Sequence, residues 1–229
     1  MKQPALVAAT DQARAALPQQ PRLPPDELVV VAWTRPEDTH GRRDTLLART
    51  VAGVLAVSPG DVVTSRLCAR CGSAAHGRPL VLGCGGGRPP FVSLARAEDL
   101  VVVAVSTGGP VGVDVEASNA PAFGGFGAVA LHQREHATTL RERAIIWTRK
   151  EALLKATGHG LRVDPRLLEM SAPADPPHLL QWAAPDPPAG VPWMATLTLH
   201  PHFVACVAVL GVQAPRLSVQ EADRAGPVC

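Results

Sequence analysis

The chain has 229 residues, and 46% of them are hydrophobic, which is enough for a packed core in one large domain or two small ones. A formal net charge of +2 excludes nucleic-acid binding by bulk electrostatics. Nothing in the sequence has the pattern of a secretory signal or a membrane span, and the five scattered cysteines fit a reducing compartment. We therefore expect a cytoplasmic protein, and we expect it to be a monomer.

The N-terminal part of the chain is expected to become ordered only after residue 26, because prolines close the stretch 1–26. Leu28–Trp33 (LVVVAW) is rich in β-branched residues and predicts a buried strand. Apolar residues at helical spacing predict a helix over Thr39–Val57, and Pro59-Gly60 ends the pattern.

The next segments predict a loop and two hairpins. Arg66–Pro90 is rich in Gly, Pro and Cys and reads as loop-like. Leu100–Val105 and Val111–Glu116 are apolar runs separated by a Gly-Gly-Pro turn, which predicts a β-hairpin. Trp193–Leu199 and Phe203–Leu210 repeat this pattern near the C-terminus.

The order of these elements indicates the fold class. Val129–Thr157 is expected to be helical, and Pro173–Pro192 is a Pro-rich excursion. Runs of hairpin and runs of helix favour an α+β fold with antiparallel sheets. Because the hairpin pattern occurs twice, we expect two similar, pseudo-twofold-related subdomains, each a small antiparallel sheet packed with helices. The expected halves are 27–117 and 118–215, followed by a tail at 216–229.

Three carboxylates form the first candidate site. Asp114 and Glu116 are two apart, so on a strand they point to the same face. Glu151 and Lys155 are four apart on an otherwise apolar helix, so they also share a face, and a buried charge there needs a partner. Three carboxylates favour a hard cation, Mg²⁺ or Mn²⁺. The alternative is that Asp114 and Glu116 end a hairpin and that Glu151 and Lys155 form a surface salt bridge of little energetic weight.

Two motifs carry a family resemblance. GVDVE (112–116) and WTRKEALLKATGHGL (147–161) resemble the signature motifs of the Sfp-type 4′-phosphopantetheinyl transferases. The resemblance extends over most of residues 28–210: HGRPL (76–80) is similar to the family's GKP element, and FVSLARAEDLVVVAV (91–105) stands where the family has its SHS strand. It implies transfer of 4′-phosphopantetheine from coenzyme A to a serine of an apo acyl or peptidyl carrier protein, with release of 3′,5′-ADP. Carriers of fatty-acid, polyketide or nonribosomal peptide synthesis are the implied partners, and which of these pathways is served stays open.

The resemblance also implies roles for individual residues. Asp114, Glu116 and Glu151 would bind Mg²⁺ together with the coenzyme A pyrophosphate, in the cleft between the two halves. Lys155 would contact a phosphate, and Lys150 is a second basic candidate. Glu151 would act as general base on the carrier serine.

Further coenzyme A contacts are implied at the family's phosphate-binding positions. The residues that stand there are Arg42, Arg43, Arg49, Arg78 and Pro79. For Arg42 and Arg43 the alternative is a solvated basic patch. Arg96 stands in place of the family's SHS histidine, and it either replaces that histidine as a permanently charged phosphate ligand or faces solvent. His159 replaces the usual basic residue of the GKGL element.

One alternative to an enzyme stays open. The chain could be a non-catalytic scaffold that binds carrier protein or coenzyme A and has a degenerate phosphate site. For the enzyme, we expect a carrier helix to lie against the apolar segment Pro121–Val129.

The cysteines offer a third candidate site. Cys68 and Cys71, with His76 and Cys84 nearby, have part of the pattern of a structural zinc site. The alternatives are a loop with reduced thiols and a zinc-ribbon interaction module over residues 66–90.

Overall fold

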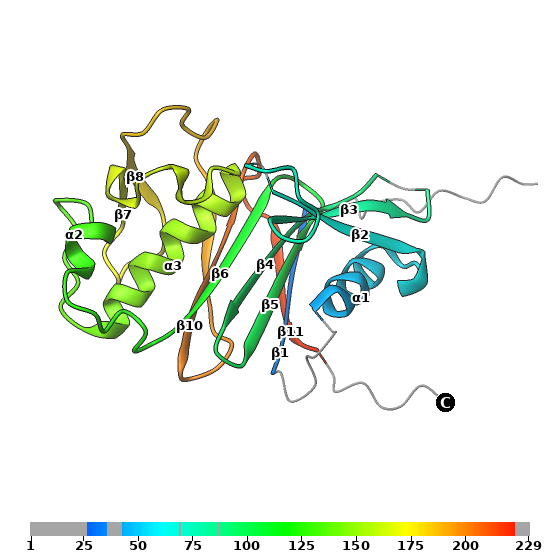
Figure 1. Ribbon diagram of the computed structural model, residues 1–229, viewed down its shortest axis with the longest axis horizontal. Coiled ribbons are helices and arrows are strands. Elements are labelled where there is room, and N and C mark those ends of the chain that lie inside the picture. The colour runs from blue at the N-terminus through cyan, green and yellow to red at the C-terminus, as the bar shows by residue number, and fades with distance from the viewer. Residues whose placement is uncertain (1–26, 36–42, 69, 87, 223–229) are drawn as a thin grey trace, which may run out of the picture.

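The protein is built around its two larger β-sheets, which pack against each other with a helix on each outer side (Figure 1). The computed structural model describes residues 27–35, 43–68, 70–86 and 88–222. The strand order is β11-β1-β5-β4 in the first sheet and β6-β10-β9 in the second. The α+β class with small antiparallel sheets is therefore confirmed, whereas the pseudo-twofold relation of the halves stays a prediction.

The first sheet is built around a strand that is buried along its whole length. β5 (Leu100–Ser106) lies between β1 (Leu28–Thr34) and β4 (Phe91–Ala97) and is antiparallel to both. Because α1 (Arg43–Leu55) covers its outer face and the second sheet its inner face, its sequence is apolar without alternation. β11 (Arg216–Glu221) adds to β1 in parallel.

The second sheet carries the acidic motif. β6 (Val111–Ala117) and β9 (Trp193–Leu197) both pair antiparallel with β10 (Phe203–Val209). This confirms the C-terminal hairpin. α3 (Leu140–Thr157) packs on the outer face, where Ala152, Leu153 and Ala156 meet side chains of β10. The helix is largely buried, as its apolar sequence predicts.

Both ends of α3 are fixed by capping interactions. The Thr139 hydroxyl accepts a hydrogen bond from the Glu142 N–H, and the Glu142 carboxylate accepts one from the Thr139 N–H, which forms a capping box. These bonds lower the pKa of Glu142 to about 2. At the C-terminus Gly158 adopts φ 76°, a conformation that favours glycine.

The remaining elements are short. They are η2 (Pro59–Asp61), β2 (Val62–Leu67), β3 (Arg78–Cys84), α2 (Phe126–Ala130), η3 (Gly160–Arg162), η4 (Pro165–Leu167), β7 (Leu168–Met170) and β8 (Leu179–Trp182). β2 pairs with β3 and β7 with β8, both antiparallel. None of the helices in the described ranges is long and apolar enough to cross a membrane.

Two predictions about local structure are wrong. Arg66–Pro90 was expected to be a loop, but its central residues form β3 of a hairpin with β2. Leu100–Val105 and Val111–Glu116 were expected to form a hairpin, but β5 and β6 lie in different sheets. The Gly-Gly-Pro turn instead carries the chain from one sheet to the other, and a Cβ on Gly109 would lie 1.9 Å from the Leu210 carbonyl oxygen.

Two further segments, one near the C-terminus and one in the Pro-rich excursion, contain strands. Residues 216–221, expected to belong to a tail, form β11 of the first sheet, and residues 1–26 and 223–229 lie outside the described residues. The Pro-rich excursion contains β8. Its first part is held by the buried guanidinium of Arg149, which donates hydrogen bonds to the carbonyl oxygens of Ser171, Ala172 and Asp175.

Candidate active site

The close approach of β6 to α3 brings the acidic residues together. A Cβ on Gly112 would lie 1.9 Å from the Ala152 carbonyl oxygen, so only glycine fits at this position of GVDVE. Gly112, Asp114 and Glu116 share the strand face toward α3, whereas the alternate valines join the core between the sheets. The strand is further fixed by the Ser93 hydroxyl of β4, which accepts a hydrogen bond from the Val113 N–H at 3.1 Å.

Lys155 forms its ion pair with Asp114 and not with Glu151. Its Nζ lies 2.6 Å from Asp114 Oδ1 and 3.1 Å from the Val113 carbonyl oxygen. Asp114 Oδ2 and Glu151 Oε1 are buried and have no hydrogen-bond partner. The sequence also allowed a surface salt bridge between Glu151 and Lys155 as an alternative. The ion pairs of the described residues do not include it.

The electrostatics of the three carboxylates show that they are close enough to repel one another. Burial, followed by repulsion from Asp114, raises the pKa of Glu151 to about 7, and Lys155 opposes the shift. Burial also raises the pKa values of Asp114 and Glu116, with a contribution from Asp114 in the case of Glu116. Packed carboxylates with raised pKa values are typical of sites that hold a cation or transfer a proton.

Trp147 positions Glu116. Its indole donates a hydrogen bond to the Glu116 carboxylate, an interaction that lowers the pKa of Glu116 against the effect of burial. Both residues line an apolar pocket of about 200 Å³. The other side chains of this pocket come from the segment between β6 and α3, and they include Phe123, which is 54% exposed, and Phe126, whose ring packs edge-on against Trp147.

Carboxylate oxygens are the ligands that a hard divalent cation prefers, and two of those in the trio have no other partner. Asp114 Oδ2 and Glu151 Oε1 are orphaned and buried, and a cation would satisfy both and relieve their repulsion. As the described residues stand, the carboxylate oxygens of Asp114, Glu116 and Glu151 do not all lie within 4.8 Å of one another. The Lys155 ammonium meanwhile neutralises Asp114.

A basic pocket of about 360 Å³ adjoins the acidic trio at Lys155 and is lined by residues that come both before and after the acidic motif in sequence. The β2–β3 hairpin contributes Arg70 and Arg78, β4 contributes Ser93 and Leu94, and the C-terminal end of α3 contributes Lys155. His159 and Arg162 lie on the segment that follows, and the His159 Nδ1 is buried without a hydrogen-bond partner. Among the described residues, no acidic side chain lines this pocket, so it is suited to a polyanion.

Only some of the residues that the resemblance implies as coenzyme A contacts line this pocket. Arg78 and Pro79 line it. Arg49 is exposed on α1 and is not among the lining residues. Arg96 is exposed, donates to the Glu98 carbonyl oxygen and does not line the pocket either. Arg42 lies outside the described residues, and so does the side chain of Arg43, the first residue of α1.

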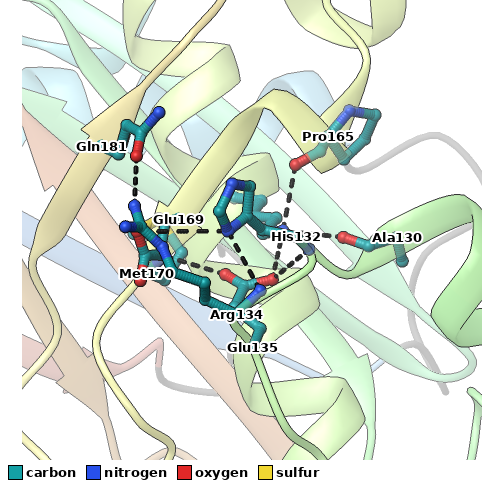
Figure 2. Close-up of polar contacts among 9 residues, drawn as sticks. Ala130, His132, Arg134, Glu135, Pro165, Glu169, Met170 and Gln181 are labelled. Carbon is teal, nitrogen blue, oxygen red and sulfur yellow. Dashed lines mark hydrogen bonds and ion pairs between the residues drawn. The ribbon is translucent and has the colours of Figure 1, made fainter.

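The structure contradicts the assignment of Lys150 as a phosphate ligand. Its side chain is fully buried, with Nζ 2.5 Å from Glu135 Oε2 and hydrogen-bonded to the carbonyl oxygens of Ala130 and Pro165. Figure 2 shows Glu135 among these partners, where it also accepts hydrogen bonds from the backbone N–H groups of His132 and Met170. Lys150 is one position before Glu151 and points away from the basic pocket, because adjacent residues on a helix lie on different faces.

Sequence reasoning missed three residues of the basic pocket. Arg70 and Arg162 line it, and Ser93 joins it to β6. Arg70 could have been found through its place between the two cysteines of a turn, but Arg162 and Ser93 carry no motif. Their contribution depends on the contact of the hairpin, β4 and α3, which are far apart in the sequence.

Comparison with known proteins agrees with this site. Residues 110–193 match the family model of the 4′-phosphopantetheinyl transferase superfamily. The match covers less than half of the chain and supports the resemblance to that superfamily. The superfamily segment includes β6, α3 and therefore all of Asp114, Glu116, Glu151 and Lys155. A search of the curated proteins found no match. The match supports phosphopantetheine transfer as the class of chemistry.

Proposed function

We propose that the protein transfers 4′-phosphopantetheine from coenzyme A to a serine of an acyl or peptidyl carrier protein, in a reaction that depends on Mg²⁺. The observation that carries the proposal is the direct contact of an acidic trio with a basic pocket. Lys155 belongs to both, since it pairs with Asp114 and lines the pocket. Phosphoryl transfer needs this combination, because its transition state is stabilised mainly by cations and positioning.

The basic pocket is assigned to the phosphates of coenzyme A. Arg78 and Arg70 on the hairpin face Lys155 and Arg162 across the two halves. Guanidinium groups bind phosphate oxygens in pairs, and burial already lowers the pKa of Arg78, so a bound anion would offset the cost of desolvating this cation. Lys155 would exchange Asp114 for a phosphate once a divalent cation neutralises the carboxylates.

The acidic trio is assigned to the divalent cation and to the proton of the carrier serine. Asp114, Glu116 and Glu151 would hold Mg²⁺, which when bound neutralises charge on the phosphoryl oxygens and the leaving phosphate. Glu151 accepts the proton as the serine oxygen forms its bond to the β-phosphorus. The bond between this phosphorus and the bridging oxygen breaks, and 3′,5′-ADP leaves with that oxygen.

The carrier protein is assigned to the apolar surface beside the acidic trio. The segment Pro121–Val129 exposes Phe123 and Val129, and its pocket includes Glu116. An apolar helix face of the carrier that packs here would bring its serine close to the carboxylates. This assignment gives the segment between β6 and α3 a function.

The proposal is tested by incubation of the protein with an apo carrier, coenzyme A and Mg²⁺. Mass spectrometry should show a phosphopantetheine adduct on the carrier serine, and none when Mg²⁺ is chelated or when Asp114→Ala replaces the wild type. Circular dichroism should show that this variant is folded. Binding of coenzyme A without any adduct would support a non-catalytic scaffold, and an adduct that forms equally fast with Asp114→Ala would reject the assigned roles.

Removal of the Arg78 guanidinium is expected to weaken coenzyme A binding. Arg78→Ala should raise the KM for coenzyme A about 10- to 100-fold with a smaller change in kcat, because a hydrogen bond to a charged group contributes about 1.5–3 kcal/mol. Arg78→Lys should keep most of the affinity, since the resembled family has lysine there. Arg88→Ala is the matched control, because Arg88 lies over the Phe91 ring outside the pocket. An unchanged KM in Arg78→Ala would contradict the assignment.

Loss of the hydrogen bond from Trp147 is expected to weaken metal binding. Trp147→Phe keeps an aromatic ring against Phe126 but leaves Glu116 without the indole donor. The Mg²⁺ concentration for half-maximal rate should rise about 10- to 100-fold, as for other residues that orient metal ligands. Trp193→Phe, a substitution on β9, should leave it unchanged. Equal Mg²⁺ dependence in both variants would show that Trp147 is only part of the pocket wall.

A further inference from the structure

The β2–β3 hairpin brings three metal-binding side chains together at its turn. The ligand atoms of Cys68, Cys71 and His76 all lie within 4.8 Å of one another. In a tetrahedral zinc site with Zn–S about 2.3 Å and Zn–N about 2.0–2.1 Å, sulfur and nitrogen lie about 3.5 Å apart. Cys71 Sγ and His76 Nε2 are 3.4 Å apart. The cluster therefore has the dimensions of a zinc site before any ion is added.

The backbone of the turn supports the two thiols. Gly72 N–H donates to the Cys68 carbonyl oxygen at 2.8 Å, and Cys68 N–H donates to the Ser73 carbonyl oxygen at 3.0 Å. Backbone N–H groups of Cys71 and Arg70 donate to the Cys68 sulfur. Donors that converge on a sulfur stabilise the thiolate, which is the form that binds metal.

The return of the chain at His76 also depends on close packing. Gly77 has φ 102°, and a Cβ there would lie 2.4 Å from the Leu67 carbonyl oxygen. Leu67 precedes Cys68, so this contact keeps His76 beside the cysteine turn. The three ligands are thus held together in the turn that joins β2 to β3.

We propose that Cys68, Cys71 and His76 bind a Zn²⁺ ion that fixes the β2–β3 turn at the rim of the basic pocket. Two thiolates and an imidazole are a soft ligand set and select zinc, whereas the carboxylates of Asp114 and Glu151 select a hard cation. The protein therefore has two sites for two kinds of metal.

The position of the turn gives the ion a structural consequence. Cys68 and Arg70 both line the basic pocket, and Arg70 lies between the two cysteines in sequence. An ion that ties Cys68 to Cys71 also limits the motion of Arg70. Three protein ligands leave a fourth position for solvent or an anion.

Cys84 is not part of this site. It pairs with Val62 at the end of the hairpin opposite to Leu67 and Arg78, and it is buried in the apolar cluster beneath α1. Of the two residues near Cys68 and Cys71 in the sequence pattern, His76 joins the site and Cys84 does not, which leaves three protein ligands.

Metal analysis of the purified protein tests the proposal without any use of transferase activity. Protein expressed with added zinc and purified under reducing conditions should contain one zinc per chain. Replacement by Co²⁺ should give the thiolate-to-cobalt charge-transfer band and the intense visible bands of a tetrahedral ion. Cys71→Ser and His76→Ala should reduce zinc content and the cobalt bands at least tenfold. His136→Ala, an exposed histidine in the other half, should keep both.

Hydrogen exchange tests the effect of the ion on the turn. Removal of zinc should speed exchange of the Gly72 and Cys68 amides at least tenfold and leave the amide of Val103 in β5 unchanged. Absence of stoichiometric zinc, equal zinc content in Cys71→Ser, or a Cys68–Cys71 disulfide that persists in the reduced preparation would each overturn the proposal.

Discussion

Glu151→Gln is expected to abolish transfer and at the same time to stabilise the metal-free protein. The rate should fall about 10³-fold, because a general base contributes about 10²–10⁴-fold. The stability gain arises because Glu151 is buried near Asp114 and Glu116, and its Oε1 has no partner. Glutamine keeps the shape of the side chain and removes the charge.

The pH dependence of this gain follows from the pKa of Glu151, which is raised from 4.5 to about 7. The folded protein binds this proton more tightly than the unfolded chain, so the stability that protonated Glu151 gives the wild type is fully present below about pH 4.5. It is lost as the pH rises through about 7, where the gain from Glu151→Gln appears. Above that, the ionised carboxylate costs about 3 kcal/mol, since one pKa unit corresponds to about 1.4 kcal/mol.

Thermal unfolding without divalent cation measures the effect. At pH 8 the Tm of Glu151→Gln should exceed that of the wild type by several degrees, and near pH 4.5 the two should coincide. Glu98→Gln, which changes an exposed carboxylate, should match the wild type at both pH values. Saturating Mg²⁺ should stabilise the wild type more than Glu151→Gln. Equal Tm values at pH 8, or an active variant, would contradict the account of Glu151.

Lys150→Met is expected to destabilise the fold by about 3–5 kcal/mol, because it leaves the buried Glu135 without its cation. The loss should appear as a lower free energy of unfolding in urea titrations. In the folded fraction the KM for coenzyme A should not change, since Lys150 does not line the basic pocket. If Lys150 were a phosphate ligand instead, its loss would raise the KM for coenzyme A and leave the free energy of unfolding nearly unchanged.

The double variant Lys150→Met/Glu135→Gln is the matched control. It removes both charges, and an amide at position 135 can still accept a hydrogen bond from the N–H of Met170 or His132. It should recover about half of the lost free energy of unfolding. No recovery would mean that Lys150 acts through its packing and not through its charge.

The sequence was most informative where a motif coincides with regular structure. The spacing of Asp114 and Glu116 and that of Glu151 and Lys155 place these side chains correctly, because a strand and a helix have fixed periods. The match to the superfamily model covers the same residues. The partner of Lys155 could not be predicted, since i,i+4 spacing permits a pair with Glu151, whereas the tertiary contact with β6 provides Asp114.

The missed features depend on contacts between distant parts of the chain. β5 and β6 look like a hairpin because both are apolar runs beside a turn, but their partners, β4 and β10, are decided by the packing of the two sheets. Lys150 has the motif position of a ligand, and only the fold shows that Glu135 meets it in the interior. Burial between layers has no local sequence signal for a single charged residue.

The central claim is that Asp114, Glu116 and Glu151 hold one divalent cation beside the basic pocket. Titration with Mn²⁺, followed by electron paramagnetic resonance in the presence of coenzyme A, tests it most directly. The account predicts one saturable Mn²⁺ per chain and an affinity at least tenfold lower in Asp114→Asn and in Glu151→Gln. Saturable binding that is unchanged in both variants, or no binding to the wild type, would contradict it.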